Sequence, residues 1–178
     1  MEHFLAGIER RALVMAELAT HDREEALDLV QDTMLAFVKR YRERPQTEWP
    51  PLFHRILQNR IRDWHRRRQR RGRWWGRLRH QREEEESDDP DPIQQTRDPR
   101  ARQPDELLLE QQSLEQILAA LERLPLRQQQ AFLLRTWEGL DVTDTARAMG
   151  CSGGSVKTHL SRAMHALRKQ LQECSHDE

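Results

Sequence analysis

The stretch DVTDTARAMGCSGGSVKTHLSRAMHALRKQL, residues 141–171, decides how this chain folds. Residues 143–149 predict a short helix, and Gly150 ends it because glycine readily adopts the left-handed conformation found at helix C-termini. Ser152 then stands at the N-cap position of a longer helix. One face of that helix is apolar at helical spacing, through Val156, Leu160, Met164, Leu167 and Leu171. The stretch therefore predicts two helices joined by a tight turn.

Two helices joined by a glycine-containing turn, the second of them basic, form the helix-turn-helix pattern. Ala146 is small enough for close helix packing, and Val156 and Leu160 anchor the second helix. Polar and basic side chains surround its outer surface: Ser155, Lys157, Thr158, His159, Ser161 and Arg162. Such side chains attract phosphates and reach base edges, and the helix N-terminus also favours phosphate. The pattern favours DNA binding over its alternative, a helical hairpin with an ordinary solvated face.

Two further helices are predicted before this pair. The first has an apolar stripe that ends at Leu124-Pro125 and consists of Leu114, Ile117, Leu118 and Leu121. The second covers residues 128–137, and Gly139 closes it in a C-cap role. The C-terminal part of the chain is therefore a small helical domain.

The N-terminal part is also predicted to be helical. Asp22 stands at an N-cap position with Glu25 three residues later, a variant of the capping box with Asp in place of Ser or Thr. The residues that follow repeat on one helical face: Ala26, Leu29, Val30, Thr33, Met34 and Phe37. Prolines at 45, 50 and 51 form a loop, and another helix starts near Leu52. No strand alternation occurs, so the sequence predicts an all-α protein.

Composition divides the chain into two small helical domains joined by a flexible, charged linker. Charged residues make up 34% of the chain and aromatic residues only 6%, which suits small cores. Residues 60–79 hold ten arginines and one acid, whereas residues 82–91 hold seven acids and one arginine. We expect domains at residues 1–72 and 106–173, with residues 73–105 too polar to order themselves.

Several segments resemble one family, the bacterial RNA polymerase sigma factors, in their compact extracytoplasmic-function (ECF) group. Residues 124–140, LPLRQQQAFLLRTWEGL, are similar to the start of that group's C-terminal domain, and residues 150–163 resemble its recognition helix. Residues 22–32, DREEALDLVQD, are similar to its polymerase-binding helix, and residues 52–60, LFHRILQNR, to its promoter-melting helix. His159 stands where the family often has Arg.

The resemblance implies a polymerase-binding face on the helix that follows Asp22. Asp28 and Asp32 lie four residues apart, and like charges at that spacing cost an isolated helix a few tenths of a kcal/mol. A basic partner surface would offset this cost, and the family implies that it belongs to the largest subunit of core RNA polymerase. The candidate residues are Asp28, Gln31, Asp32 and Leu35. The alternative is a solvated acidic face.

The resemblance also implies two promoter sites. The minus-ten element, with unstacked bases, needs cations along the strand and flat groups for the bases. Candidates for it are Arg40, Tyr41, Arg44, Trp49, His54, Arg55, Gln58, Asn59 and Arg62. Core packing is the alternative role for Trp49. Candidates for the minus-thirty-five element are Ser155, Lys157, Thr158, His159 and Arg162.

Other classes of protein fit less well. No glycine-rich phosphate loop or nucleophile with a base is present, so we expect neither an enzyme nor a cofactor. The eight histidines are scattered and Cys174-Ser175-His176 lacks metal-ligand spacing, so no metal site is expected. A helix-turn-helix regulator acting without polymerase remains the alternative function, and a decoy that binds only a regulator is a further one.

The remaining expectations concern location and partners. No apolar stretch is long enough to span a membrane and no signal-peptide core is seen near the first residue, so we expect a cytoplasmic protein. We expect a protein that is a monomer when it is not in complex, and the resemblance implies core RNA polymerase, promoter DNA and an anti-sigma factor as its partners. The acidic run of residues 83–91 could also cover the basic surface in the free protein, which is a hypothesis of autoinhibition.

Overall fold

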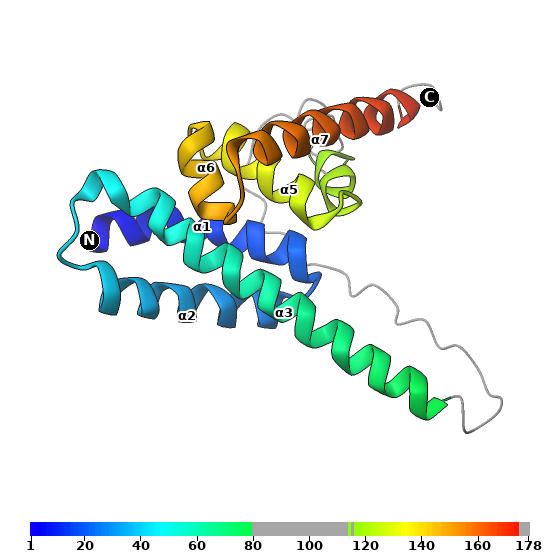
Figure 1. The fold of residues 1–178 in the computed structure, drawn as a ribbon, viewed down its shortest axis with the longest axis horizontal. Coiled ribbons are helices and arrows are strands. Elements are labelled where there is room, and N and C mark those ends of the chain that lie inside the picture. Colours follow the sequence, from blue (N-terminus) through cyan, green and yellow to red (C-terminus); the bar gives the residue numbers. More distant parts are fainter. Residues whose placement is uncertain (80–113, 115, 175–178) are drawn as a thin grey trace, which may run out of the picture.

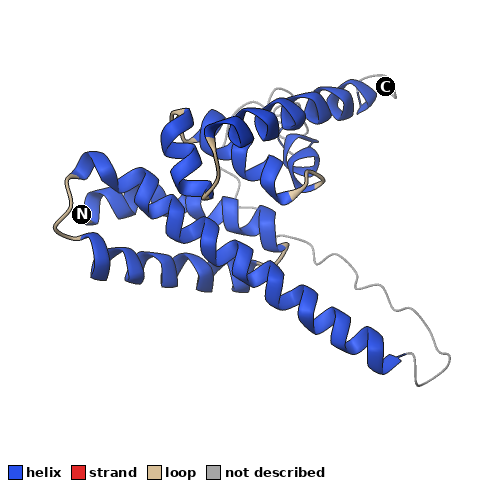
Figure 2. Ribbon diagram, viewed as in Figure 1, coloured by secondary structure: helices blue, strands red, loops and turns tan. Residues whose placement is uncertain are grey.

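The computed structural model describes residues 1–79, 114 and 116–174, and these residues form helices connected by short loops, without a strand among them (Figure 2). The helices are α1 (Glu2–Thr20), α2 (Arg23–Tyr41), α3 (Trp49–Arg79), α5 (Leu126–Phe132), α6 (Val142–Met149) and α7 (Gly153–Cys174). A 3-10 turn, η1 (Gln46–Glu48), precedes α3, and a π turn, η2 (Leu133–Trp137), follows α5. Residues 116–122 are also helical. The all-α prediction is confirmed.

Helices α1, α2 and α3 pack together as an N-terminal bundle (Figure 1). One end of the bundle is filled by aromatic rings. The ring centroid of Phe37 lies 5.7 Å from that of Phe4 and 5.6 Å from that of Phe53. Such tilted and edge-on pairs add to the free energy of burying the rings. The apolar face predicted for α2 is therefore the face that meets α1 and α3.

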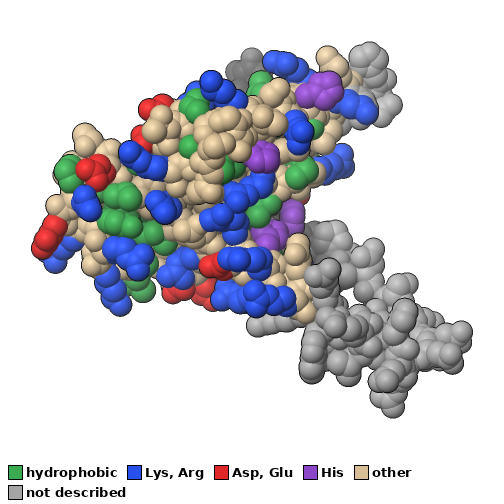
Figure 3. Space-filling model, in the orientation of Figure 1, with side chains coloured by type: hydrophobic (Ala, Val, Ile, Leu, Met, Phe, Trp, Pro, Cys, Tyr) green, Lys and Arg blue, Asp and Glu red, His purple; other side chains and the backbone are tan. Residues whose placement is uncertain are grey.

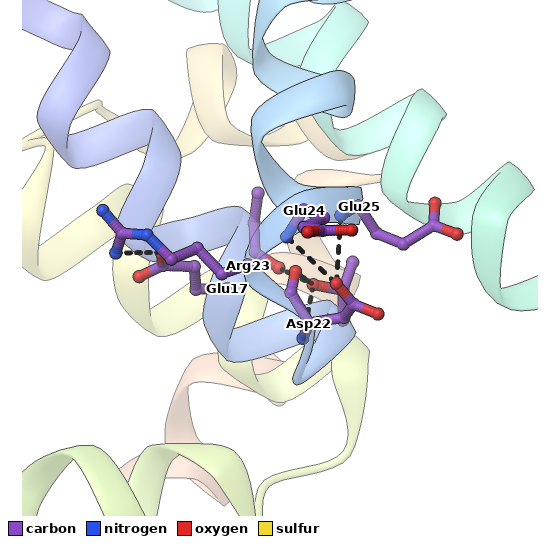
Figure 4. Close-up of polar contacts among 7 residues, drawn as sticks. Glu17, Asp22, Arg23, Glu24 and Glu25 are labelled. Carbon is purple, nitrogen blue, oxygen red and sulfur yellow. Dashed lines mark hydrogen bonds and ion pairs between the residues drawn. The ribbon is translucent and has the colours of Figure 1, made fainter. Parts of the chain in front are cut away.

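The start of α2 confirms the predicted N-cap (Figure 4). Oδ1 of Asp22 accepts hydrogen bonds from the backbone N–H groups of Glu24, at 3.0 Å, and Glu25, at 3.1 Å. The reciprocal half of a capping box is not formed. Instead, the Glu25 carboxylate accepts the indole N–H of Trp64 in α3 at 3.0 Å. The cap residue thus fixes the start of α2, while Glu25 ties α2 to α3.

The predicted helix-turn-helix is formed by α6 and α7. Gly150 has φ of 63°, which ends α6 in the left-handed conformation, and Oγ of Ser152 accepts the N–H of Ser155 at 3.1 Å. Val156 is fully buried against α5 and α6, as the sequence predicted. Gly153 also matters, because a Cβ there would lie only 3.2 Å from Cγ1 of Val142. Close packing of the two helices therefore depends on a glycine that the sequence pattern did not single out.

The helix predicted for residues 128–137 is not regular. It starts at Leu126 and changes from an α-helix to the π turn η2 at Leu133, so that the N–H of Glu138 binds the carbonyl oxygen of Leu133 at 3.0 Å. Gly139 follows with φ of 68°, in agreement with its predicted role at the helix end. π turns of this kind are often found at functional positions.

Helix α3 is longer than the sequence predicted. It continues to Arg79 and so includes residues that we assigned to the linker, and its last turns extend away from the bundle (Figure 1). Arginine has a high helix propensity and no proline interrupts residues 52–79, which explains the extension. The remaining linker residues, including the acidic run of residues 83–91, lie outside the described residues.

The two halves of the chain share an apolar core. Leu121, Leu133 and Leu167 belong to the same buried cluster as the apolar side chains of α1, α2 and α3. The buried amide of Gln129 connects them further, because its Nε2 donates to the carbonyl oxygens of Leu18, at 3.2 Å, and Leu121, at 3.1 Å. The C-terminal domain therefore packs on the N-terminal bundle in this structure.

Candidate nucleic-acid and polymerase interfaces

The outer face of α2 carries all four residues predicted to contact polymerase. Asp28, Gln31 and Asp32 are exposed, and Leu35 is 60% exposed. The opposite face is buried. An exposed leucine beside two carboxylates gives this surface an apolar part and an acidic part. It would suit a partner that has an apolar patch bordered by basic side chains.

Three of the predicted minus-ten residues line one hollow. Tyr41, Arg44 and Arg55 surround a cavity of about 360 Å³ at the junction of α2, η1 and α3. Leu52 and Pro51 contribute apolar surface, and Arg147 of α6 borders the cavity from the C-terminal domain. Guanidinium groups around an apolar floor can hold a phosphate and a base together. Arg40 is exposed at the end of α2, one residue before Tyr41.

Trp49 does not present its ring to a nucleic acid. The residue is 6% exposed, its ring centroid lies 5.5 Å from that of Phe4, and its indole N–H donates to the carbonyl oxygen of Arg44 at 2.8 Å. Core packing, which the sequence left as the alternative, is therefore its role in this structure. The bond from Trp49 to Arg44 instead fixes the loop that carries the cavity.

His54 and Gln58, which were candidates for the minus-ten element, are also buried. With Arg62 they are spaced four residues apart and form one face of α3, which we call the seam face (His54, Gln58 and Arg62). His54 lies 3.2 Å from Glu138, and a Cβ on Gly150 would lie 3.7 Å from Nη2 of Arg62. The C-terminal domain therefore contacts this face at His54 and Arg62, whereas Nε2 of Gln58 lies 4.0 Å from the sulfur of Met15 in α1. Asn59 is half-buried beside it.

The outer surface of α7 holds the residues predicted for the minus-thirty-five element. Lys157, Thr158 and Arg162 are exposed, and Ser155 and His159 are half-buried. The hydroxyl of Thr158 donates to the carbonyl oxygen of Gly154 at 3.1 Å, so it is engaged within the helix. Lys and Arg side chains gather along the face that includes α3 and α7 (Figure 3). This surface attracts phosphate groups.

Sequence reasoning missed a buried charge between the two halves. The Glu138 side chain is 4% exposed, and its carboxylate lies 2.8 Å from Nε of Arg11 in α1 and 3.2 Å from Nε2 of His54 in α3. We call these three residues the closing contact (Arg11, His54 and Glu138). Arg11 and His54 each lie more than 80 positions from Glu138 along the chain, so no local pattern could have indicated the contact.

At the junction between the two halves, the surroundings favour the charged form of Glu138 but disfavour the charged form of Arg62. Burial alone would raise the pKa of Glu138, but its contacts with His54 and Arg11 outweigh burial, so the pKa lies below its ordinary value of 4.5. Burial, and then the positive charge of Arg127, lower the pKa of the Arg62 guanidinium. Arg62, Arg66 and Arg127 line one cavity of about 500 Å³ between the halves. The junction thus combines an attractive contact between charged groups at Glu138 with a group of arginines that repel one another.

Comparison with known families identifies the class of protein. Residues 4–71 match the family model for sigma-70 region 2, and residues 114–167 match that for sigma-70 region 4. Because the two models match in order and together cover more than half of the chain, this protein belongs to the sigma-70 family of RNA polymerase sigma factors, in its ECF group.

Curated relatives support the group. The chain is 40% identical over 70 residues to the ECF RNA polymerase sigma factor BldN of Streptomyces coelicolor, which is 39% of this chain and 26% of that protein. It is 33% identical over 69 residues to the ECF RNA polymerase sigma factor SigX of Bacillus subtilis, which is 39% of this chain and 36% of that protein. The matches thus span about a quarter to a third of the relatives' length.

A solved structure shares the fold. The sigma factor RpoE of Bartonella quintana, crystallised in complex with the anti-sigma factor NepR, superposes with a TM-score of 0.62 at 24% identity, over 96% of each chain. The likeness extends over both halves of the chain. Within the part of the chain that the structure describes, no helix combines the length and apolar character needed to cross a bilayer.

Proposed function

We propose that this protein is a sigma factor that binds core RNA polymerase and directs it to initiate transcription at specific promoters. The observation that carries the proposal is the order of the two sigma-70 regions, with the exposed polymerase face of α2 in the first and the helix-turn-helix in the second. A helix-turn-helix regulator acting without polymerase is not favoured, because it has no use for the α2 face.

The proposed mechanism consists of binding steps without covalent chemistry. The outer face of α2 docks on the polymerase through Asp28, Gln31, Asp32 and Leu35. Helix α7 enters the major groove of the minus-thirty-five element, where Lys157 and Arg162 contact phosphates or bases. The cavity of Tyr41, Arg44 and Arg55 holds the melted minus-ten strand, with arginines on the backbone and the tyrosine ring against a base.

Its partners follow from this role. Core polymerase and promoter DNA are the functional partners, and an anti-sigma factor is proposed as the regulator because the structural relative was crystallised with one. A sigma factor works where the chromosome is, so we place the protein in the cytoplasm, as a monomer when it is not in complex. A stress or envelope-response regulon would fit the ECF group.

Run-off transcription with purified core polymerase and genomic promoter fragments tests the proposal. We expect transcripts that depend on the protein and start at a limited number of sites, and we expect the protein to co-elute with core polymerase. A protein that neither binds core nor directs initiation would contradict the proposed function. Binding to duplex DNA with no effect of core polymerase would support the regulator instead.

A further inference from the structure

The cavity between the two halves of the chain gathers three guanidinium groups. Arg62 and Arg66 line it from α3, and Arg127 lines it from α5. We call it the arginine cavity (Arg62, Arg66 and Arg127). Its volume of about 500 Å³ lies within the range of pockets that hold small ligands. Packing of the halves thus places Arg127 beside two arginines that lie more than 60 positions earlier in the chain.

The positive charge of the arginine cavity is only partly neutralised. Asp63 is the one acidic side chain among the described residues that line the cavity, and its carboxylate pairs with Arg66. His65 also lines the cavity, and burial lowers its pKa below the ordinary value, so it adds no charge at neutral pH. Three guanidinium groups against one carboxylate leave two positive charges.

Two of the three arginines form no ion pair within the part of the chain that the structure describes. Nη2 of Arg62 donates to the neutral amide oxygen of Asn59, and the buried Nε of Arg62 has no hydrogen-bond partner among the described residues. Nη1 of Arg127 donates to the carbonyl oxygen of Met149 at 2.8 Å, which holds this guanidinium at the end of α6. The cavity therefore contains two oriented cations that lack a counter-charge.

An anion in the cavity would offset the cost of this arrangement. Burial, and then the charge of Arg127, disfavour the charged form of Arg62, and an anion that contacts both groups compensates both. Guanidinium groups bind phosphate oxygens through paired N–H donors, and such bonds are about twice as strong as those between neutral groups.

The charge and shape of the cavity favour a small ligand over a nucleic-acid strand. A strand carries its charges one per nucleotide along a line, whereas these guanidinium groups surround a single hollow. A diphosphate group concentrates its negative charge and its acceptor oxygens in one place. It can therefore balance the two positive charges and accept hydrogen bonds from more than one arginine at once.

We propose that the arginine cavity binds the diphosphate group of a small anionic ligand, with Arg62 and Arg127 as the main contacts. Arg66 contributes from the rim, since its side chain is 67% exposed. The site lies apart from the α2 face and from the outer surface of α7, and it shares only Arg62 and Asn59 with the predicted minus-ten residues. The inference does not depend on the proposed function, because ligand binding is a property of the free protein.

The first experiment is calorimetric titration of the free, full-length protein with inorganic pyrophosphate, without divalent cations and at fixed ionic strength. We expect one site per molecule and tighter binding than that of sulfate. Arg127→Gln should weaken pyrophosphate binding by about 10-fold, and Arg66→Gln should weaken it less. Arg70→Gln is the matched control, because Arg70 is an exposed arginine of α3 that does not line the cavity. It should change the affinity least.

A second variant should strengthen binding, which loss of folding cannot imitate. Asp63→Asn removes the negative charge from the cavity and frees Arg66, so pyrophosphate affinity should rise by about 3-fold to 10-fold. The matched control is Asp144→Asn. Asp144 also pairs with an arginine three positions later, Arg147 at 3.4 Å, but this pair lies outside the cavity. The control should raise the affinity less.

The outcomes separate a diphosphate site from general attraction of anions. The inference is overturned if pyrophosphate binds no more tightly than sulfate, or if Asp63→Asn and Asp144→Asn raise its affinity equally. A short single-stranded DNA, titrated under the same conditions, tests the other source of phosphate. Binding of the DNA that depends on Arg127, without binding of pyrophosphate, would assign the cavity to a nucleic-acid backbone and would also overturn the inference. Circular dichroism checks that Arg127→Gln is folded.

Discussion

Arg60 of α3 holds Asp32 of α2 through two contacts. Nη1 of Arg60 lies 2.7 Å from Oδ2 of Asp32, and Nη2 lies 3.1 Å from the backbone carbonyl oxygen of Asp32. Asp32 is one of the two carboxylates assigned to polymerase binding, and among the described residues its neighbour Asp28 has no such partner. In the proposed function, a basic partner surface would meet Asp28 directly but would compete with Arg60 for Asp32.

This competition leads to a first prediction, for Arg60→Gln. The change frees Asp32 and removes a positive charge that repels a basic surface, so core polymerase affinity should rise by about 3-fold to 10-fold at low salt and less at high salt. Fluorescence anisotropy with labelled protein measures it. The free energy of unfolding should change by less than about 1 kcal/mol, because the pair is exposed. Arg23→Gln, which breaks the exposed pair with Glu17 in the same bundle, is the control and should raise core affinity less, because it removes the same charge without freeing Asp32.

A second prediction concerns Leu35, the most exposed of the large apolar side chains that the structure describes. Leu35→Ala should weaken core binding by more than about 1 kcal/mol if the leucine is buried in the complex. It should leave the melting temperature almost unchanged, because little apolar area is lost from the core. Leu29→Ala is the contrasting variant. Leu29 is buried in the same helix, so that change should destabilise the protein by about 2–5 kcal/mol. Unchanged core affinity in Leu35→Ala would place the polymerase contact elsewhere.

A third prediction separates the two DNA sites. Arg162→Ala should weaken binding to the upstream promoter element by about 1–3 kcal/mol while core binding stays intact. Arg168→Ala, a second exposed arginine on α7, is the matched control, since it lies further from the end of the helix that approaches the groove. Electrophoretic mobility shifts with holoenzyme and a promoter fragment measure both. Equal losses for the two variants would indicate general charge attraction in place of specific docking.

The cap of α2 gives a fourth prediction. Asp22→Ala removes the acceptor for two backbone N–H groups and should lower the free energy of unfolding by about 1 kcal/mol. Asp22→Ser should retain most of the stability because serine is also a good N-cap. Chemical denaturation followed by circular dichroism gives the values. An alanine variant as stable as the serine variant would show that the Asp22 side chain contributes nothing to the helix.

Glu138 gives a fifth prediction, for the dependence of stability on pH. Its pKa is lowered in the folded protein, so the unfolded state binds a proton more readily than the folded state. The stabilising contribution is therefore complete above the ordinary value of 4.5 and is lost as the pH falls below it, through the lower pKa of the folded protein. Comparison of unfolding curves for Glu138→Gln and the unaltered protein between pH 6 and about pH 3 measures it. The difference in stability between the two proteins should shrink as the pH falls, and a constant difference would contradict the prediction.

Local features of the fold could be predicted from sequence because each depends on neighbouring residues. The cap at Asp22 and the end of α6 at Gly150 require hydrogen bonds or backbone angles within a few positions. The apolar stripes of α2 and α7 follow from helical periodicity. The exposure of Leu35 and Arg162 also agrees with the sequence, since each stands on the face opposite a stripe. The resemblance to sigma factors then implied that the exposed face of α2 binds polymerase and that of α7 binds DNA.

The sequence by itself thus determined the start of α2, the helix-turn-helix and the resemblance to a family, but not the length of α3 or the π turn after α5. The tertiary structure alone decided which polar side chains are buried. Trp49, His54 and Gln58 have no sequence feature that separates them from exposed neighbours such as Arg55. His54 is buried because Glu138, far away in the chain, packs against it, and Trp49 because Phe4 and Phe37 meet there. Burial of a polar group depends on such non-local packing and pairing, which helical periodicity within one segment does not encode.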